Sequence, residues 1–281
     1  MPQPGNLYAD LAGYYDRFCA EVDYAGQCAF TQRAFTCFSS SGGRDYLDLA
    51  CGTGQHLLHM SDYGFAVTGL DNSRDMLAQA ARRVPQAELL LCDLAAFDQV
   101  EAFDLISCFL YSIHYSHPTA ALEETLRRAW RALKPGGVFI FNAVDAAGIA
   151  ASRTIQTRLT EGDSELSFRS GWQYSGNGDV LELVLGITRT SVGGQDSWHD
   201  RHTMTAIRFT QLQRLLQTTG FETTFLEHDY DTMRPWDGTG FNVIVMACKP
   251  SAGKHDYCFE SSPQATSVKK AEQLFKLSNT T

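Results

Sequence analysis

The chain has 281 residues, of which 44% are hydrophobic and 20% are charged, a composition typical of a globular protein with a sizeable core. Its formal net charge of -9 offers no broadly basic face for a phosphate backbone, so a nucleic-acid partner is disfavoured. The cysteines show neither Cys-x-x-Cys pairs nor zinc spacing, and no apolar run approaches the roughly 20 residues that span a bilayer. Because the N-terminus also lacks the basic and apolar regions of a signal peptide, we expect a soluble, cytoplasmic protein with no metal and no membrane partner.

Two helices are expected first, between residues 6 and 39, with apolar residues at helical spacing. A strand at 46–50 then runs into the glycine turn 51–54 and a helix at 55–61. Further strands and helices alternate along the next part of the chain: strands at 65–70, 87–92, 103–109 and 137–141, and helices at 73–83 and 119–133. This alternation predicts a parallel sheet that is covered by helices on both faces.

The alternation stops near residue 148. Three β-prone runs separated by glycine-rich turn sequences predict an antiparallel insertion: 165–174, 180–190 and 198–209. A helix at 210–219 and strands at 221–228 and 241–248 follow, and the linker between these strands is too short for a crossover helix, so the sheet is mixed. We therefore divide the chain into five segments: 1–42 as an N-terminal helical lid, 43–147 as a cofactor-binding core, 148–209 as the insertion on the acceptor side, 210–249 as the completion of the sheet, and 250–281 as a flexible tail.

Ligands of open α/β sheets bind outside the carboxyl ends of the strands. Gly52 and Gly54 allow a tight turn there and a close approach of the backbone to a ligand, and the helix that follows offers free amides to a carboxylate or phosphate. Asp71 ends the second strand, the position from which a carboxylate binds both hydroxyls of a ribose. Asp93 ends the third strand and is placed to accept from an adenine amino group. These residues together predict a ligand that contains adenosine.

The sequence of the glycine turn distinguishes between two adenosine-containing ligands, NAD and S-adenosylmethionine. A dinucleotide site requires a third glycine, and Leu57 stands in its place. Asp48 precedes the turn instead, where it is placed to receive the α-ammonium group of a methionine moiety through water or nearby backbone. The pattern thus favours S-adenosylmethionine over NAD. An NAD-dependent oxidoreductase and a non-catalytic cofactor-binding partner of a methyltransferase remain the alternatives.

The segment Asp48 to Gly54, together with Asp71, Asp93 and the turn 134–137, resembles the motifs of class I S-adenosylmethionine-dependent methyltransferases. The resemblance spans about residues 43–145 and, more weakly, 6–40 and 208–248. Within that family the chain is similar to small-molecule N-methyltransferases such as amino-sugar dimethylases and glycine methyltransferases. These carry a Tyr-Asp pair in an N-terminal helical segment, here Tyr15 and Asp16. The resemblance implies a Rossmann-like α/β fold with a seven-stranded mixed sheet of order 3-2-1-4-5-7-6, its last strand antiparallel, with N-terminal helices and an antiparallel insertion after strand 5.

The residues expected to bind the cofactor lie in the N-terminal segment and at the strand ends: Tyr15, Asp48, Ala50, Cys51, Gly52, Gly54, Asp71, Asn72, Met76, Cys92, Asp93, Leu94 and Phe109. His114 and Tyr115, after the fourth strand, are the candidates for a base or an orienting group at the acceptor. A buried loop histidine is the alternative interpretation of His114.

The insertion supplies further candidates for lining an acceptor pocket: Trp172, Trp198, His199, His202 and Arg208. Methyl transfer needs mainly the in-line placement of an acceptor lone pair, so no separate catalytic triad is required. We expect a small-molecule acceptor, an amine more than a hydroxyl, and a monomer or homodimer.

Overall fold

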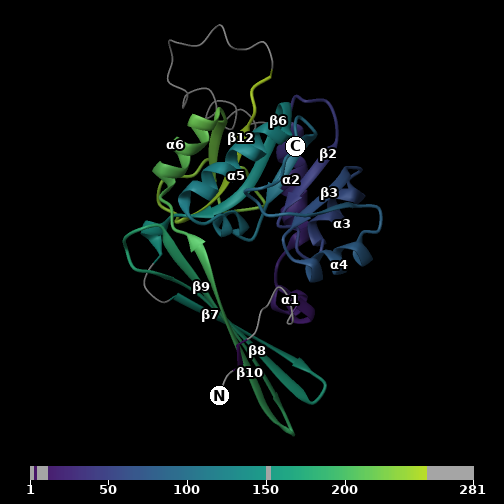
Figure 1. Cartoon of the computed structure of the whole chain (residues 1–281), viewed down its shortest axis with the longest axis vertical. Helices are drawn as coiled ribbons and strands as arrows, with labels where there is room; N and C mark the ends of the chain where they lie inside the picture. The colour runs from purple at the N-terminus through teal and green to yellow at the C-terminus, as the bar shows by residue number, and fades with distance from the viewer. Residues whose placement is uncertain (1–2, 5–11, 150–152, 252–281) are drawn as a thin grey trace.

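The computed structural model describes residues 3–4, 12–149 and 153–251 and contains two sheets (Figure 1). The larger sheet consists of β2 (Asp45–Leu49), β3 (Ala66–Asp71), β4 (Glu88–Leu91), β5 (Phe103–Cys108), β6 (Leu133–Val144), β11 (Glu222–Glu227) and β12 (Asn242–Cys248). Its spatial order is β11-β12-β6-β5-β2-β3-β4, with β12 antiparallel to both of its neighbours and the first five strands parallel. Numbered within the sheet, this is 3-2-1-4-5-7-6, which confirms the predicted Rossmann-like fold.

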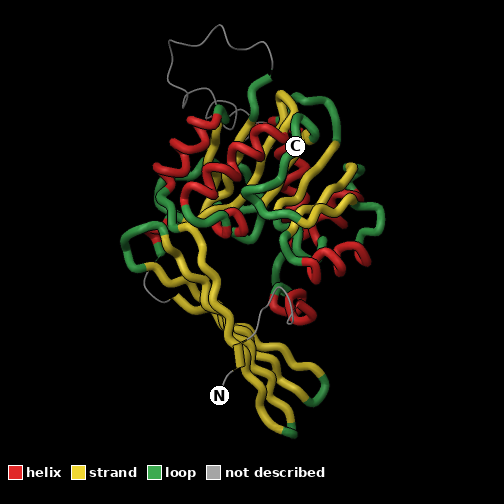
Figure 2. The backbone as a smooth tube through the Cα atoms, viewed as in Figure 1, coloured by secondary structure: helices red, strands yellow, loops and turns green. Residues whose placement is uncertain are grey.

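Helices cover both faces of this sheet, as Figure 2 shows. One face carries α2 (Tyr24–Phe38), α3 (Gln55–Asp62) and α4 (Arg74–Arg83), and the other carries α5 (Thr119–Ala132) and α6 (Phe209–Thr219). Successive side chains of a strand point to opposite faces, so Tyr46 packs beneath the first group of helices and Leu47 beneath the second. Strands buried on both faces explain the nearly continuous apolar runs in the sequence.

Ahead of α2 lies the short helix α1 (Ala12–Phe18). The beginning of the first predicted helix, with Leu7 and Leu11, lies outside the described residues, and so does the predicted tail from residue 252 onward. Among the helices of the described chain, none combines the length and the apolarity that crossing a membrane requires.

The second sheet is the insertion after β6. It consists of β7 (Arg153–Glu161), β8 (Ser164–Tyr174), β9 (Val180–Ser191) and β10 (Gly194–Thr205), all antiparallel, with the short β1 (Gln3–Pro4) parallel to β10 at one edge. It projects from the core as a long twisted ribbon (Figure 1). We predicted three β segments here and the structure has four. β7 was missed because its turn into β8 has a single glycine, Gly162, at φ 57°.

The inner face of the insertion, the face toward the core, is mostly apolar. Phe168 and Ile187 pack against Tyr15 and Phe18 of the N-terminal segment, near one end of this face. Near the other end, Met204 lies in a cluster with aromatic side chains that follow β5. The insertion therefore lies against the N-terminal segment and against the carboxyl end of the large sheet.

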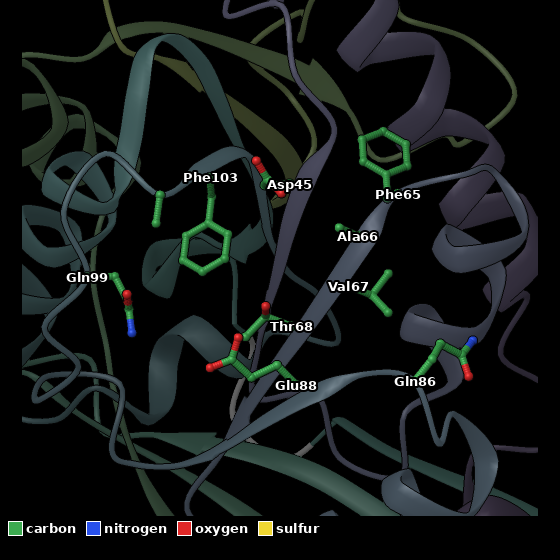
Figure 3. Close-up of a pocket in the computed structure, with 10 residues that line it drawn as sticks. Asp45, Phe65, Ala66, Val67, Thr68, Gln86, Glu88, Gln99 and Phe103 are labelled. Atoms are coloured by element: carbon green, nitrogen blue, oxygen red, sulfur yellow. The ribbon is translucent and has the colours of Figure 1, made fainter.

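The opposite, amino edge of the large sheet holds the turn 134–137, which the structure includes in β6. Lys134 Nζ lies 2.6 Å from Asp45 Oδ2 and 2.8 Å from Asp104 Oδ2, so this segment ties the starts of three strands together. A cavity of about 400 Å³ opens beside it, lined by residues such as Phe65, Glu88 and Phe103 (Figure 3). Because ligands of such sheets bind at the carboxyl ends of the strands, this cavity lies away from the predicted site.

Candidate active site

The glycine turn lies at the carboxyl end of β2. Ala50, Gly52 and Gly54 all have positive φ, at 57°, 54° and 83°. A Cβ atom on Gly52 would meet only the ring of Tyr15, at 3.8 Å, so the space in front of this residue is open. A Cβ on Gly54 would lie 3.1 Å from that of Ala80 in α4, so this glycine instead permits close helix packing. Since no side chain caps α3, the Gly52 side of the turn forms a cradle for an anionic group.

Asp71, at the end of β3, lies directly beside this cradle. Its Oδ2 accepts a hydrogen bond from the Gly52 amide at 2.9 Å, and its Oδ1 accepts from the Ser73 amide at 2.8 Å. A carboxylate has about four lone-pair sites, so Asp71 retains capacity to accept from a ligand hydroxyl. Burial raises the pKa of the carboxyl above its ordinary value. Asp71 thus holds the glycine turn in place and can also accept a hydrogen bond from a ligand. The sequence indicated only the role toward a ligand.

The remaining strand-end residues separate into exposed and buried groups. Asn72 and Asp93 are exposed and Cys92 is half-buried, so a ligand reaches them from solvent. The other apolar candidates are almost fully covered, with exposed fractions of 5% for Cys51, 1% for Met76, 8% for Leu94 and 3% for Phe109. The Met76 thioether has almost no surface left for an adenine, which argues against the contact we expected. The Cys51 side chain likewise packs against Gly69 and leaves only its backbone for a ligand.

The position of the Asp48 carboxylate corrects our expectation of a partner for an ammonium group. It is 1% exposed and points under α3, because alternation along β2 places it on the same face as Tyr46. Its Oδ1 accepts from the Ser107 hydroxyl at 2.8 Å, and its Oδ2 has no hydrogen-bond partner and lies 3.8 Å from His56 Nδ1. Burial raises the pKa of this carboxyl to about 7. Any influence of Asp48 on a ligand therefore passes through the backbone of the glycine turn.

The N-terminal segment is tied to the glycine turn by an ion pair. Asp16 Oδ2 lies 2.6 Å from the guanidinium of Arg83 in α4, and Asp16 Oδ1 accepts from the Thr53 hydroxyl at 2.6 Å. Arg83 also donates to the Thr53 carbonyl. These contacts hold the neighbouring Tyr15 against the open side of Gly52, which places it among the groups that would enclose a ligand.

His114 lies in the 3-10 helix η1 (Ser112–Tyr115), which follows β5, and the structure gives it a supporting position. It is 1% exposed, its Nδ1 donates to the Thr205 carbonyl at 2.8 Å, and its Nε2 accepts from the Val144 amide at 3.1 Å. Burial lowers its pKa to about 4. Both ring nitrogens are thus occupied by backbone partners. We therefore withdraw His114 as a base for the acceptor and adopt the alternative interpretation of a buried loop histidine.

Tyr115, the second candidate, contacts the insertion. Its hydroxyl lies 2.7 Å from His202 Nδ1, and His202 Nε2 lies 2.8 Å from Asp200 Oδ2. Sequence reasoning singled out His202 and missed Asp200, although their spacing of two residues on β10 already places both on one face. His199 is on the opposite face and is exposed, as is Arg208, so neither joins this group.

A second group at this edge contains Trp172, which the sequence indicated, and His228 and Tyr230, which it did not. The Tyr111 ring packs edge-on against Trp172 with centroids 5.0 Å apart, and its hydroxyl lies 3.3 Å from His228 Nε2. The Tyr230 hydroxyl lies 3.4 Å from the same nitrogen and accepts from the Asn142 amide. His228 and Tyr230 escaped notice because they lie in an irregular segment after β11 that is far away in the sequence and carries no periodic pattern.

An open α/β sheet with a glycine cradle and a carboxylate of ribose-binding type at its carboxyl edge defines a Rossmann-like enzyme that binds a nucleoside cofactor. Comparison with known proteins then identifies the family. A family model described as a methyltransferase domain matches residues 47–137. A dTDP-3-amino-3,6-dideoxy-alpha-D-glucopyranose N,N-dimethyltransferase of Streptomyces fradiae is 31% identical over 191 residues, which cover 64% of this chain and 71% of that protein. The chain belongs to the class I S-adenosylmethionine-dependent methyltransferases, and S-adenosylmethionine is its cofactor.

Many solved structures share the fold, and two of them illustrate the likeness. The sugar N-methyltransferase KedS8 of a Streptoalloteichus species superposes with a TM-score of 0.75 at 21% identity, covering 89% of this chain and 97% of that protein. DesVI of Streptomyces venezuelae superposes with a TM-score of 0.72 at 22% identity, covering 86% and 99%. Both superpositions extend over most of this chain and nearly all of the other.

Proposed function

We propose that this methyltransferase transfers a methyl group to the amino group of a small molecule, and that an amino sugar is the class of acceptor. The observation that carries the proposal is the group formed by Tyr111, Trp172, His228 and Tyr230 at the carboxyl edge of the sheet. It combines aromatic faces with phenol and imidazole groups, the mixture that binds a compact polar ligand with apolar ring faces. Asn142 and Asn242 add amide groups beside it.

The position of this group supports an acceptor site next to the cofactor. The Tyr230 ring lies 6.0 Å from that of Phe109, the first residue after β5, and Phe109 stacks on His56 of α3 at 5.1 Å. α3 itself begins at the glycine cradle. An acceptor held by Tyr111 and Tyr230 would therefore lie within reach of a cofactor whose amino-acid part occupies the cradle.

Residues of the chain divide the work of binding and orientation in this proposal. The cradle at Gly52 and the first amides of α3 hold the amino-acid part of the cofactor, Asp71 holds the ribose, and Asp93 meets the adenine. The cofactor supplies a sulfonium methyl group that is already activated. The insertion and α1 exclude water and hold the acceptor nitrogen in line, and such placement contributes about 7–11 kcal/mol to lowering a barrier of this kind.

Two further observations support this reading over its rivals. Leu57 stands where a dinucleotide motif has its third glycine, which such motifs use for close packing of helix against strand, and its Cδ1 would lie 2.7 Å from a Cβ on Gly69 of β3. The chain therefore departs from that motif. Relatives that carry the names of amino-sugar N,N-dimethyltransferases favour an amine over a hydroxyl acceptor.

The direct test is to incubate the protein with S-adenosylmethionine and dTDP-3-amino-3,6-dideoxy-α-D-glucopyranose and to follow the product by mass spectrometry. Addition of one or two methyl groups to nitrogen supports the proposal. The matched control is the same nucleotide sugar with a hydroxyl in place of the amine. Methylation of that control, with none of the amino sugar or of a panel of small amines, would overturn the assignment of an amine acceptor.

A second test uses Trp172→Ala. Removal of the Trp172 indole should raise KM for the amino sugar at least tenfold. The Kd for S-adenosylhomocysteine should stay within about twofold, because the indole lies on the acceptor side of the site alone. Val192→Ala, a change at a 95% exposed hairpin tip, is the control. An equal loss of affinity for both ligands would contradict the separation of the two sites.

A further inference from the structure

We propose that Tyr115, His202 and Asp200 form a proton relay that removes the proton from the acceptor amine, with Tyr115 as the group that touches the acceptor. The inference rests on the proposed function, because it assigns the proton chemistry of the same acceptor site.

The hydrogen bonds define the direction of the relay. A carboxylate only accepts hydrogen bonds, so the contact of 2.8 Å between His202 Nε2 and Asp200 Oδ2 places the ring proton of His202 on Nε2. Nδ1 of the neutral ring is then an acceptor, and the Tyr115 hydroxyl donates to it at 2.7 Å. The phenol proton therefore points at a base, and the phenol oxygen, which carries two lone pairs, can accept a proton from an acceptor. This is the arrangement by which a carboxylate and a histidine activate a hydroxyl in acyl-transfer enzymes.

The three residues of the relay lie at the proposed acceptor site, and two of them are partly exposed to solvent. Asp200 and His202 pair across the strands with Leu185 and Leu183, so both lie on the inner face of the insertion. Tyr115 packs in the same cluster as Tyr111 and is only partly buried. The side chains of His202 and Asp200 are 11% and 18% exposed, which leaves a route by which the proton reaches solvent.

A partly buried ionisable pair on a mostly apolar face is costly unless its groups are paired. Its neighbours on β9 are leucines, and the strand could be completed with apolar residues at both positions. Two other histidines at this edge, His114 and His228, lack the same arrangement. His114 has both nitrogens occupied by backbone groups. Nε2 of His228 is shared between two phenols at 3.3 and 3.4 Å, which are longer contacts than that between Tyr115 and His202.

The proton transfers balance as follows. An acceptor that arrives as an ammonium ion gives one proton to the Tyr115 oxygen, while the phenol proton moves to His202 Nδ1. The phenol stays neutral, the imidazole becomes an imidazolium paired with Asp200, and the acceptor nitrogen regains its lone pair. That lone pair forms the N–C bond to the methyl group as the C–S bond breaks and its electron pair stays on sulfur. The imidazolium then returns its proton to water.

The first test does not depend on turnover. In protein loaded with S-adenosylhomocysteine and labelled with nitrogen-15 at histidine, long-range correlation spectra report the tautomer of each ring. His202, assigned with the variant His202→Gln, should carry its proton on Nε2. Asp200→Asn should move that proton to Nδ1, because the amide becomes a donor to Nε2, whereas Asp196→Asn on the same strand should leave the tautomer unchanged. A proton on Nδ1 in the unaltered protein would overturn the relay.

The second test is the dependence of turnover on pH, with the dTDP-amino sugar as the acceptor. Tyr115→Phe and Asp200→Asn should each lower kcat about 100-fold near neutral pH, the size of a lost general base. The loss should shrink as the pH passes the pKa of the acceptor amine, because the amine then arrives without its proton. Asp196→Asn should stay within twofold of the unaltered enzyme. A loss that is the same at every pH would assign these residues to structure and overturn the relay.

These tests also separate the relay from the proposed function. If the unaltered enzyme methylates a hydroxyl and no amine, the proposed acceptor class fails. The tautomer experiment still decides whether Asp200, His202 and Tyr115 have the hydrogen-bond arrangement of a relay, since it requires no acceptor.

Discussion

Replacement of His114 tests whether this residue acts as a support between the core and the insertion. His114→Ala leaves the buried Val144 amide without its acceptor and the Thr205 carbonyl without the imidazole donor. An unsatisfied buried group costs about 1–3 kcal/mol, so we expect a loss of about 2–5 kcal/mol in the free energy of unfolding. In a protein of this size that corresponds to a fall in Tm on the order of 5–10 °C. His114→Asn, which keeps a donor near Thr205, should lose about half as much.

The same residue makes a pH-dependent contribution whose sign follows from its lowered pKa. Above pH 6.5 the imidazole is neutral in both the folded and the unfolded chain, so it adds no pH dependence. Below that value His114 binds a proton in the unfolded chain, whereas in the folded chain it stays neutral until about pH 4. The shift of roughly 2.5 pKa units corresponds to about 3 kcal/mol of stability lost on acidification over this range.

The assay is urea unfolding of the unaltered protein and of His114→Asn between pH 7.5 and 4.5, followed by circular dichroism. The stability difference between the two proteins should narrow as the pH falls, because the variant lacks this titration. His56, whose pKa burial lowers to about 3, titrates in both proteins and cancels in the comparison. A variant with unchanged stability at neutral pH and a turnover reduced 100-fold would refute the supporting role and restore the catalytic one.

Three further predictions concern the cofactor side of the site. Asp71→Ala should weaken S-adenosylhomocysteine binding by about 1.5–3 kcal/mol in calorimetry, as for the loss of a charged acceptor, and unchanged affinity would defeat its assignment to the ribose. Gly52→Val should weaken S-adenosylhomocysteine binding more than Gly54→Val does. Gly54→Val should lower Tm more than Gly52→Val does, because its side chain would enter α4. The opposite ranking of the two variants would contradict the division of roles in the turn. Burial raises the pKa of Asp48 from 3.8 to about 7, so the folded protein loses stability as the pH rises from about 4 to about 7, where the unfolded chain has released the proton and the folded chain still holds it. Asp48→Asn should therefore gain roughly 4 kcal/mol more, relative to the unaltered protein, at pH 8 than at pH 4, and equal effects in urea unfolding at both pH values would contradict this interpretation.

The sequence predicted the large sheet and its glycine turn because both depend on local signals. Alternating apolar runs and the glycine pair after the first strand are sufficient to place β2, α3 and the cradle. Asp71 was predicted for the same reason, since the end of a parallel strand fixes where its side chain lies. Its bond to the Gly52 amide was not predictable, because it depends on the register between β2 and β3.

The acceptor side was predicted less completely because distant segments build it. Asp200 acquires its role from the pairing of β10 with β9 and from Tyr115, which is far away in the sequence. The contact between His228 and Tyr111 depends on the position of β11 in the sheet, which local sequence does not give. The loop after β5 was misread at His114 because Leu110 and Tyr111 both adopt positive φ, at 54° and 61°, a conformation that side chains rarely take and that redirects the chain.

The central claim is that the carboxyl ends of β2, β3 and β4 hold S-adenosylmethionine through the Gly52 cradle and Asp71. Isothermal titration with S-adenosylhomocysteine, compared in parallel with NADH, tests it most directly. We predict saturable one-to-one binding of S-adenosylhomocysteine that Asp71→Ala weakens at least tenfold, and no heat from NADH. Binding of NADH but not of S-adenosylhomocysteine would contradict the account. An S-adenosylhomocysteine affinity that Asp71→Ala leaves unchanged would also contradict it.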